Sequence, residues 1–188
     1  ADAILSAGHQ KVDFVIVASG PNGASPHHDS SDRIIGIGEP VVVDIGGTMP
    51  SGYCSDSTRM YVCGQPPAEF GKHYEVLHQA QHHAVSSVVA GMSGAQADAL
   101  AREVMEENGL GDYFIHRTGH GLGLDTHEDP YIVASNHDSL VVGNVFSIEP
   151  GFYIPGKFGA RIEDIVALTE NGVVNFNNTS HDLTLLSP

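Results

Sequence analysis

Two aspartates lie twelve residues apart in the segment DIGGTMPSGYCSDSTR, residues 44–59. Asp44 ends one apolar run and Asp56 precedes another, with a turn-forming Pro-Ser-Gly triplet between them. If the turn is centred on Pro50, the two strands form a hairpin in which Asp44 lies directly opposite Asp56, with Cβ atoms about 4.5–5.5 Å apart. Two carboxylates held so close repel each other, and a bound cation would remove that conflict. The spacing therefore predicts a metal site on this hairpin.

A second pair of acids repeats the pattern nearer the C-terminal end of the sequence. Glu149 and Glu163 each interrupt an apolar run, in FSIEPG and in ARIEDIV. A turn centred on Gly156 places these two carboxylates opposite each other as well. Acids also occur on solvated strand faces, but two pairs that are each symmetric about a turn favour metal binding over that interpretation.

A histidine-rich segment, HRTGHGLGLDTHEDP, offers a neutral ligand from His116, His120 or His127. Four carboxylates with one imidazole form an oxygen-rich set that fits two divalent ions, and this set favours Mn²⁺ over a thiolate-type zinc site. Two such ions about 3.5–4 Å apart can hold a bridging water and polarise a carbonyl group. The donor set therefore predicts a hydrolase.

Other chemistries have weaker support in the sequence. The glycines around His120 resemble a fragment of a dinucleotide-binding loop, but no strand-helix-strand unit surrounds them. His127-Glu128 is not the helical zinc motif, because no histidine follows three residues after the glutamate. No G-x-S-x-G nucleophile elbow occurs. Cys54 shares the face of Asp56 by strand parity, and we interpret it as a small packed side chain.

The composition narrows the class of protein. The chain has 188 residues, of which 41% are hydrophobic and 16% charged, as in an ordinary globular domain with a full core. Its formal net charge of −15 argues against nucleic acid as a partner, because phosphate binding needs clustered Lys and Arg. No apolar stretch is long enough to span a membrane. Two cysteines make no disulfide framework, and this predicts a cytoplasmic location.

Hydrophobic periodicity predicts the elements that must position these side chains. Apolar runs bounded by turn residues predict strands at 12–18, 40–47, 55–62, 145–154 and 160–169. Between them, one helix opens after Pro66-Pro67 and a second spans about 94–107. The core-facing residues are expected to be Phe70, Tyr74, Leu77, Ala84 and Val88 in the first helix, and Ala97, Leu100, Ala101 and Val104 in the second. This order of elements predicts one α+β domain with an antiparallel sheet.

Taken together, the motifs VVVDIGG…SDSTR, HRTGHGLGLDTHEDP, SIEPG and RIED resemble the pita-bread metallopeptidases, the family of methionine aminopeptidase, aminopeptidase P, prolidase and creatinase. The likeness runs from about residue 12 to about residue 175, with the motifs in the family's order. It is strongest to the prolidase and aminopeptidase P branch, and to bacterial Xaa-Pro dipeptidases in particular. The resemblance implies a pseudo-symmetric antiparallel sheet with helices packed on it. It also implies hydrolysis of the bond between an N-terminal residue and proline.

The resemblance assigns a role to individual residues. It implies five ligands for two divalent ions, with Mn²⁺ expected first and Co²⁺ or Zn²⁺ as alternatives: Asp44, Asp56, His120, Glu149 and Glu163. It implies three catalytic residues: His27 near the scissile nitrogen, His127 at the tetrahedral intermediate, and Glu149 as the group that moves the proton. It implies three residues of the substrate pocket: His116, Tyr153 and Arg161.

The resemblance also implies that residues 1–188 are a catalytic domain that lacks its first helices and the family's N-terminal domain. The chain opens without a methionine on ADAILSAG, which is typical of the end of a helix, so we expect the natural N-terminus to be missing. The full-length form is expected to be a homodimer that acts on small peptides with proline at position two. Two alternatives stay open: an inactive peptide- or protein-binding module on the same fold, and a metal hydrolase of another small amide or ester.

Overall fold

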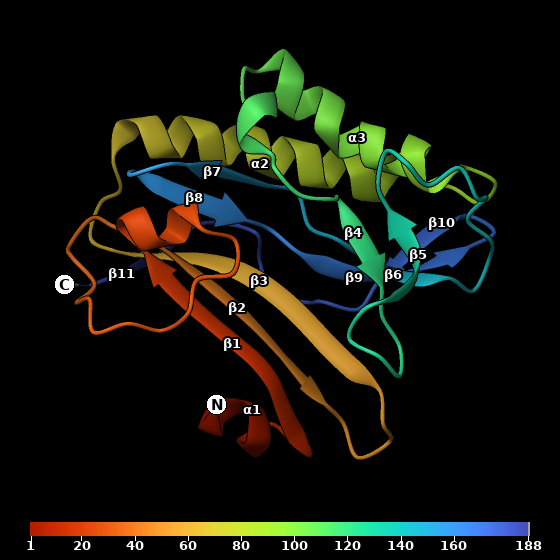
Figure 1. Cartoon of the computed structure of the whole chain (residues 1–188), viewed down its shortest axis with the longest axis horizontal. Helices are drawn as coiled ribbons and strands as arrows, with labels where there is room; N and C mark the ends of the chain where they lie inside the picture. The colour runs from red at the N-terminus through yellow and green to blue at the C-terminus, as the bar shows by residue number, and fades with distance from the viewer. Residues whose placement is uncertain (188) are drawn as a thin grey trace.

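The computed structural model describes residues 1–187. Its first sheet contains three strands from the N-terminal third of the chain and one from the C-terminal end. This sheet has the strand order β1-β2-β3-β11 and is antiparallel except for β11, which pairs in parallel with β3. Figure 1 shows its first three strands extending away from the two long helices. The elements are α1 (Asp2–Ser6), β1 (Lys11–Ser19), β2 (Pro40–Thr48), β3 (Cys54–Cys63) and β11 (Thr184–Leu186).

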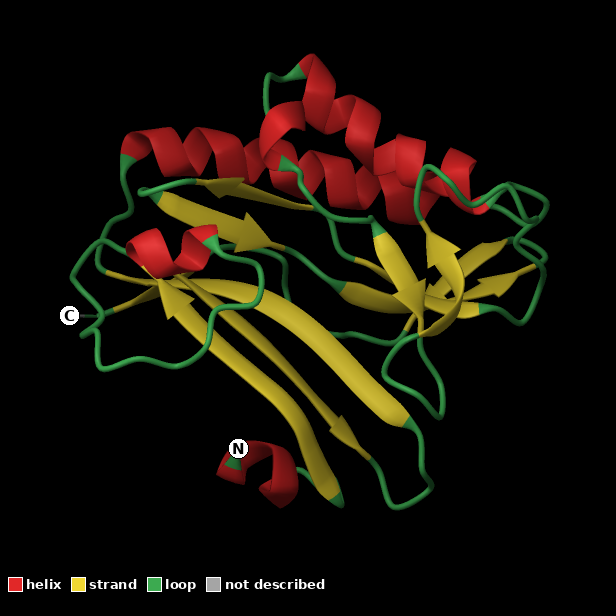
Figure 2. Ribbon diagram, viewed as in Figure 1, coloured by secondary structure: helices red, strands yellow, loops and turns green. Residues whose placement is uncertain are grey.

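Two long helices lie together over the remaining strands (Figure 2). Helix α2 (Ala68–Ser87) begins after Pro66-Pro67, and all five of its predicted core residues are buried, although Val88 follows its last turn. Helix α3 (Gly94–Glu107) starts at a capping box in which Ser93 and Gln96 exchange side-chain to backbone hydrogen bonds. These two signals explain why both helices begin where the sequence predicts.

The buried stripe of α3 differs from the predicted one. Ala97 and Ala101 are buried as expected, but Leu100 and Val104 are only partly buried. Met105 takes their place in the core, and the helix also buries the polar residue Asp98. Asp98 is buried because its carboxylate accepts hydrogen bonds from Thr118, just before β4, and hydrophobic periodicity cannot indicate a polar residue that is buried in this way.

The C-terminal half of the chain carries two further sheets below the helices. The larger has the order β10-β9-β6-β4-β5, and the smaller pairs β7 with β8. The predicted strands 145–154 and 160–169 are each split in two, and the prediction missed β4, β5, β10 and β11. The bounds are β4 (Gly119–Gly121), β5 (Glu128–Ile132), β6 (Val145–Ile148), β7 (Gly151–Ile154), β8 (Phe158–Arg161), β9 (Asp164–Thr169) and β10 (Gly172–Asn175).

The first hairpin has a register two residues away from the predicted one. Asp44 pairs with Thr58, and Asp56 pairs with Gly46, so the predicted direct pairing of the two aspartates is wrong. The loop closes with a hydrogen bond from Met49 N to Tyr53 O, and its centre therefore lies at Ser51, one residue after Pro50. Because side chains alternate with a period of two, this shift leaves Asp44 and Asp56 on the same face of the sheet.

The second hairpin has the predicted register. Gly151 pairs with Arg161 across the turn at Gly156, and Ile148 pairs with Asp164 further along, which centres both ladders on residue 156. The ladder is interrupted between these two stretches, where Glu149 and Glu163 lie.

None of the helices within residues 1–187 combines the length and the apolar character that a membrane crossing requires.

Candidate metal centre

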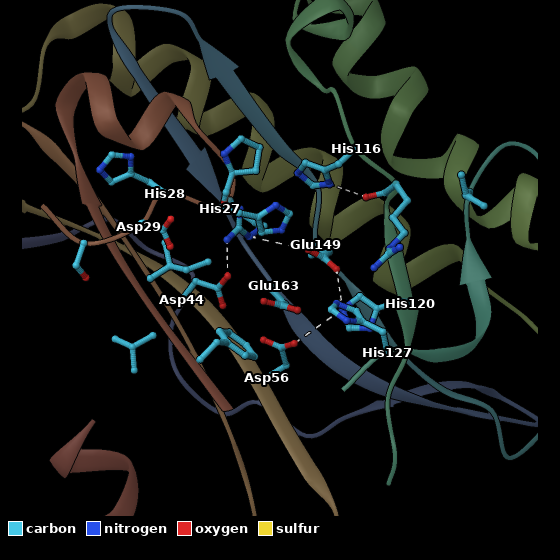
Figure 3. Close-up of a pocket in the computed structure, with 18 residues that line it drawn as sticks. His27, His28, Asp29, Asp44, Asp56, His116, His120, His127, Glu149 and Glu163 are labelled. Atoms are coloured by element: carbon cyan, nitrogen blue, oxygen red, sulfur yellow. Dashed lines mark hydrogen bonds and ion pairs between the residues drawn. The ribbon is translucent and has the colours of Figure 1, made fainter. Parts of the chain in front are cut away.

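The face shared by β2 and β3 supplies two buried acids. Asp44 and Asp56 are each only 6% exposed, and Asp44 lies in a strand, β2, that is rich in β-branched residues. Figure 3 shows their carboxylates pointing toward the same space as Glu149, Glu163 and His120. The structure thus brings together all five residues that were predicted as metal ligands.

Glu149 and Glu163 enter this space from the interruption between the two small ladders. The backbone N–H of Glu149 donates to the carbonyl of Thr118, and that of Glu163 donates to the carbonyl of Thr58. Each glutamate therefore bonds outside its own hairpin, to β3 or to the segment before β4. This exchange of partners explains why the strands break here and how the two acids reach the aspartates.

His120 comes from the short strand β4, in which a glycine on each side of it packs against neighbouring backbone. A Cβ at Gly119 would lie 1.9 Å from the carbonyl oxygen of Ser147, so only glycine fits there. The Nδ1 of His120 lies 3.0 Å from the carbonyl of Gly121, and because a carbonyl only accepts, Nδ1 carries the proton. Nε2 is then left as a lone-pair donor, 3.2 Å from Oε1 of Glu149.

The unbalanced charge of the cluster shows that a cation fits. Oδ1 of Asp44 is buried and has no hydrogen-bond partner among the described residues. Burial, followed by repulsion from Asp44 and Glu149, raises the pKa of Asp56 to about 9. Burial and the charge of Asp56 raise the pKa of Glu163 well above its ordinary range. One ligand atom each from Asp56, His120 and Glu163 lie within 4.8 Å of one another, and a divalent ion would neutralise this group.

Arg161 supplies the positive charge that the site already contains. It is buried, and its guanidinium donates to Oδ2 of Asp44, to the hydroxyl of Tyr153 and to the hydroxyl of Thr58. Tyr153 in turn lies 3.0 Å from Nε2 of His116. This chain of contacts links Asp44, a predicted ligand, to His116 on the opposite wall.

Nine of the ten predicted site residues line one cavity of about 830 Å³, and Tyr153 is the exception. Tyr153 lies behind the wall, where burial raises its pKa to about 12. His27 is exposed at the cavity, and the ring of His127 lies 4.1 Å from that of His120. Burial lowers the pKa of His127, and it lowers that of His116 to about 4, so both rings are neutral at pH 7.

Several residues that hold the ligands were missed by the sequence reasoning. The hydroxyl of Thr58 donates to Oε2 of Glu163 at 2.7 Å, and that of Ser147 donates to Oε1 of Glu149 at 2.9 Å. Both are two residues away from a ligand along the chain, so strand parity could have identified them. The sequence held no comparable signal for Asp98, whose carboxylate accepts from Thr118 and so fixes the segment before His120.

Comparison with known proteins identifies this site's family. The model of metallopeptidase family M24 matches residues 1–170, which is most of the chain. The chain belongs to metallopeptidase family M24. Membership confirms the predicted family and accounts for a donor set suited to divalent metal ions.

The chain is similar to proteins described as dipeptidases and to proteins described as Xaa-Pro dipeptidases. The chain is 54% identical over 186 residues to "Probable dipeptidase PepE" of Mycobacterium tuberculosis, a match that covers 99% of the chain and 50% of that relative. It is 42% identical over 183 residues to "Xaa-Pro dipeptidase" of Lactobacillus delbrueckii subsp. lactis, covering 97% of the chain and 50% of the relative. The chain thus spans about half the length of these relatives.

A solved M24 structure confirms the fold. The crystal structure of dipeptidase PepE from Mycobacterium ulcerans superimposes with a TM-score of 0.98 at 55% identity, over 100% of this chain and 51% of that one. The predicted pita-bread α+β fold is therefore correct, with the differences in register and strand bounds described above.

Proposed function

We propose that the chain is the catalytic part of a metal-dependent exopeptidase that hydrolyses the bond between an N-terminal residue and proline. The observation that carries this proposal is the convergence of Asp44, Asp56, His120, Glu149 and Glu163 in one cavity, with a buried carboxylate oxygen of Asp44 left unpaired. These five side chains would hold two divalent ions, Mn²⁺ in the first place. Such ions supply a Lewis acid and a water molecule of lowered pKa when bound.

The chain's own residues transfer the proton, stabilise the oxyanion and contact the substrate. Glu149 takes up a proton from the attacking water and passes it to the leaving nitrogen, an assignment supported by its place in the cavity and by the Ser147 hydroxyl that orients it. His127, neutral at pH 7, donates a hydrogen bond to the oxyanion of the tetrahedral intermediate. His27 contacts the substrate near the scissile nitrogen.

Recognition of proline must rest on shape, because the proline nitrogen in a peptide bond has no hydrogen to donate. The cavity wall offers apolar side chains for a pyrrolidine ring, from Phe14, Ile16, Pro26 and Val133. His116 and Arg161 contact the substrate beside this wall, and Tyr153 holds both of them in place. The name Xaa-Pro dipeptidase of a relative supports this specificity.

The full-length form is proposed to be a cytoplasmic homodimer. Cys54 and Cys63 are both free thiols, which supports a reducing compartment. An inactive binding module is the alternative from another class, and the intact donor set argues against it. A hydrolase of another small amide is the second alternative, and only substrates can distinguish it.

A substrate panel with added Mn²⁺ tests the proposed activity. We expect turnover of a dipeptide Xaa-Pro or of a longer Xaa-Pro peptide, with little turnover of a Met-Ala peptide or of creatine, because the apolar wall fits the pyrrolidine ring. The measurement is the initial rate of product release by chromatography, with Asp56→Ala protein as the blank. Faster cleavage of Met-Ala or creatine would replace the proposed specificity, and no cleavage of any member would favour the binding module.

A further inference from the structure

A buried ion pair lies directly behind the strands that carry the ligands, and the proposed chemistry does not use it. Asp164 has no solvent exposure, and its Oδ1 accepts a hydrogen bond from Nη2 of Arg59 at 2.7 Å. A charge buried this deeply is costly unless it is paired and hydrogen-bonded. Its Oδ2 accordingly accepts from three donors: Gln81 at 3.0 Å, Asn175 at 2.6 Å and His181 at 2.7 Å.

Arg59 uses its other N–H groups on backbone carbonyls from three segments. Its Nη1 donates to the carbonyls of Thr58 at 2.9 Å and of Glu163 at 2.5 Å. Its Nε donates to the carbonyl of Ser180 at 3.1 Å, and Nη2 also donates to that of Thr179 at 3.0 Å. Because the guanidinium is a rigid planar fork, these contacts fix the three segments in one relative geometry.

Residues 58–59 and residues 163–164 contact each other on both faces of their backbone, on the cavity side and on the far side. Successive side chains in extended chain point to opposite faces, so Thr58 and Arg59 diverge, and Glu163 and Asp164 diverge likewise. On the cavity side, Thr58 donates to the side chain of Glu163. On the far side, Arg59 bonds Asp164. The ligand Asp56 lies on β3 with Thr58, two residues away on the same face.

This junction joins two different sheets. Strand β3, with Asp56, belongs to the sheet β1-β2-β3-β11, whereas Glu163 immediately precedes β9 of the other sheet. No shared ladder therefore fixes the separation of these two ligands, whose oxygens must reach the same cation. A backbone hydrogen bond of 3.3 Å from Glu163 N to the carbonyl of Thr58 joins the two segments, and Arg59 reinforces it by holding the carbonyls of both residues.

We propose that Arg59 and Asp164 are a positioning pair that sets the distance between Asp56 and Glu163 and thereby the affinity of the site for divalent metal. Neither side chain lines the cavity, so the pair acts through the ligands it holds. Gln81, Asn175 and His181 keep the Asp164 carboxylate in place. The inference rests on the proposed metal centre and deepens it.

The test is the Mn²⁺ affinity of an Arg59→Lys variant, measured by isothermal titration and by the paramagnetic resonance signal of free Mn²⁺. Lysine keeps the positive charge beside Asp164 but cannot reach the carbonyls of Thr58 and Glu163 together. We expect the Kd for Mn²⁺ to rise about 10–100-fold, the usual effect of removing a group that orients metal ligands. Circular dichroism and thermal melting of the metal-free protein report the fold.

A matched control separates positioning from general stability. Ser93→Ala removes the capping-box hydrogen bond from Gln96 N to the Ser93 hydroxyl at 3.2 Å, at the start of α3, and Ser93 shares no hydrogen bond with Arg59 or Asp164. We expect it to lower the melting temperature and keep the wild-type Kd. Equal Kd values for Arg59→Lys and wild type, or an equal rise in Ser93→Ala, would overturn the inference.

A second variant, Asp164→Asn, keeps the side-chain size and is expected to raise the Kd in the same direction. If both variants fail to fold with excess Mn²⁺, the pair is a folding element and the inference is wrong. Absence of Mn²⁺ binding in the wild type would instead overturn the metal centre, and this inference with it. If the wild type binds Mn²⁺ and the folded variants bind it with the same Kd, only the positioning role is wrong.

Discussion

Replacing Asp56 or Glu163 with alanine is expected to reduce peptide hydrolysis to background and to abolish the rise in melting temperature that Mn²⁺ gives the wild type. At a Mn²⁺ concentration of 100 times Kd, each bound ion stabilises the wild-type fold by about 2.7 kcal/mol. The metal-free variants should melt at the wild-type temperature or above it. The reason is that each variant removes a buried carboxylate whose pKa is raised by burial and by repulsion from neighbouring carboxylates.

Thermal melts of the metal-free and Mn²⁺-loaded proteins measure both effects. Asp29→Ala is the matched control, because Asp29 also lines the cavity but is exposed and is not in the ligand set. The control should keep the metal-induced rise. If Asp56→Ala or Glu163→Ala kept it too, that residue would no longer be a ligand.

Loss of His127 is expected to slow turnover without releasing metal. In His127→Gln, kcat should fall about 10²–10³-fold, equivalent to roughly 2.7–4 kcal/mol, because one donor to the oxyanion is lost. The fall should appear equally in kcat and kcat/KM, since the contact forms mainly in the transition state. Loss of His120, whose Nε2 faces Glu149, should instead lower metal content. Steady-state kinetics and elemental analysis of both variants make the comparison.

Another histidine of the same cavity provides the control for this experiment. His28 lines the cavity and has no assigned role, so His28→Gln should keep kcat near the wild-type value. Near-normal kcat in fully loaded His127→Gln would remove His127 from the mechanism. Loss of metal from that variant would mean that the roles of His120 and His127 were assigned wrongly.

The sequence predicted which face of the sheet carries the proposed ligands more reliably than it predicted their partners across the sheet. A turn displaced by one residue shifts an antiparallel register by two, so Asp44 faces Thr58 rather than Asp56 and yet stays on the correct side. At the second hairpin, the turn is centred on Gly156, as predicted, where the backbone is left-handed with φ of 75°, and the predicted register follows. An error of two residues in the register therefore changed the predicted cross-strand partners but not the face of the sheet on which each side chain lies.

The residues that hold the ligands from behind could not be predicted from local pattern. Arg59 and Asp164 are 105 residues apart, and each follows a residue of the site, so both read in the sequence as ordinary charged neighbours. Asp98 lies on a helical face where periodicity predicts apolar residues, and its partner Thr118 comes from another segment. Such contacts depend on how the sheets and helices pack, which periodicity does not encode.

The most direct test of the metal centre is elemental analysis of the folded protein after loading with Mn²⁺ and desalting. We expect about two divalent ions per chain, because a single ion would leave part of the buried carboxylate set repelling itself. Asp56→Ala protein, prepared in parallel, gives the background. Absence of bound metal in correctly folded wild-type protein would contradict the site.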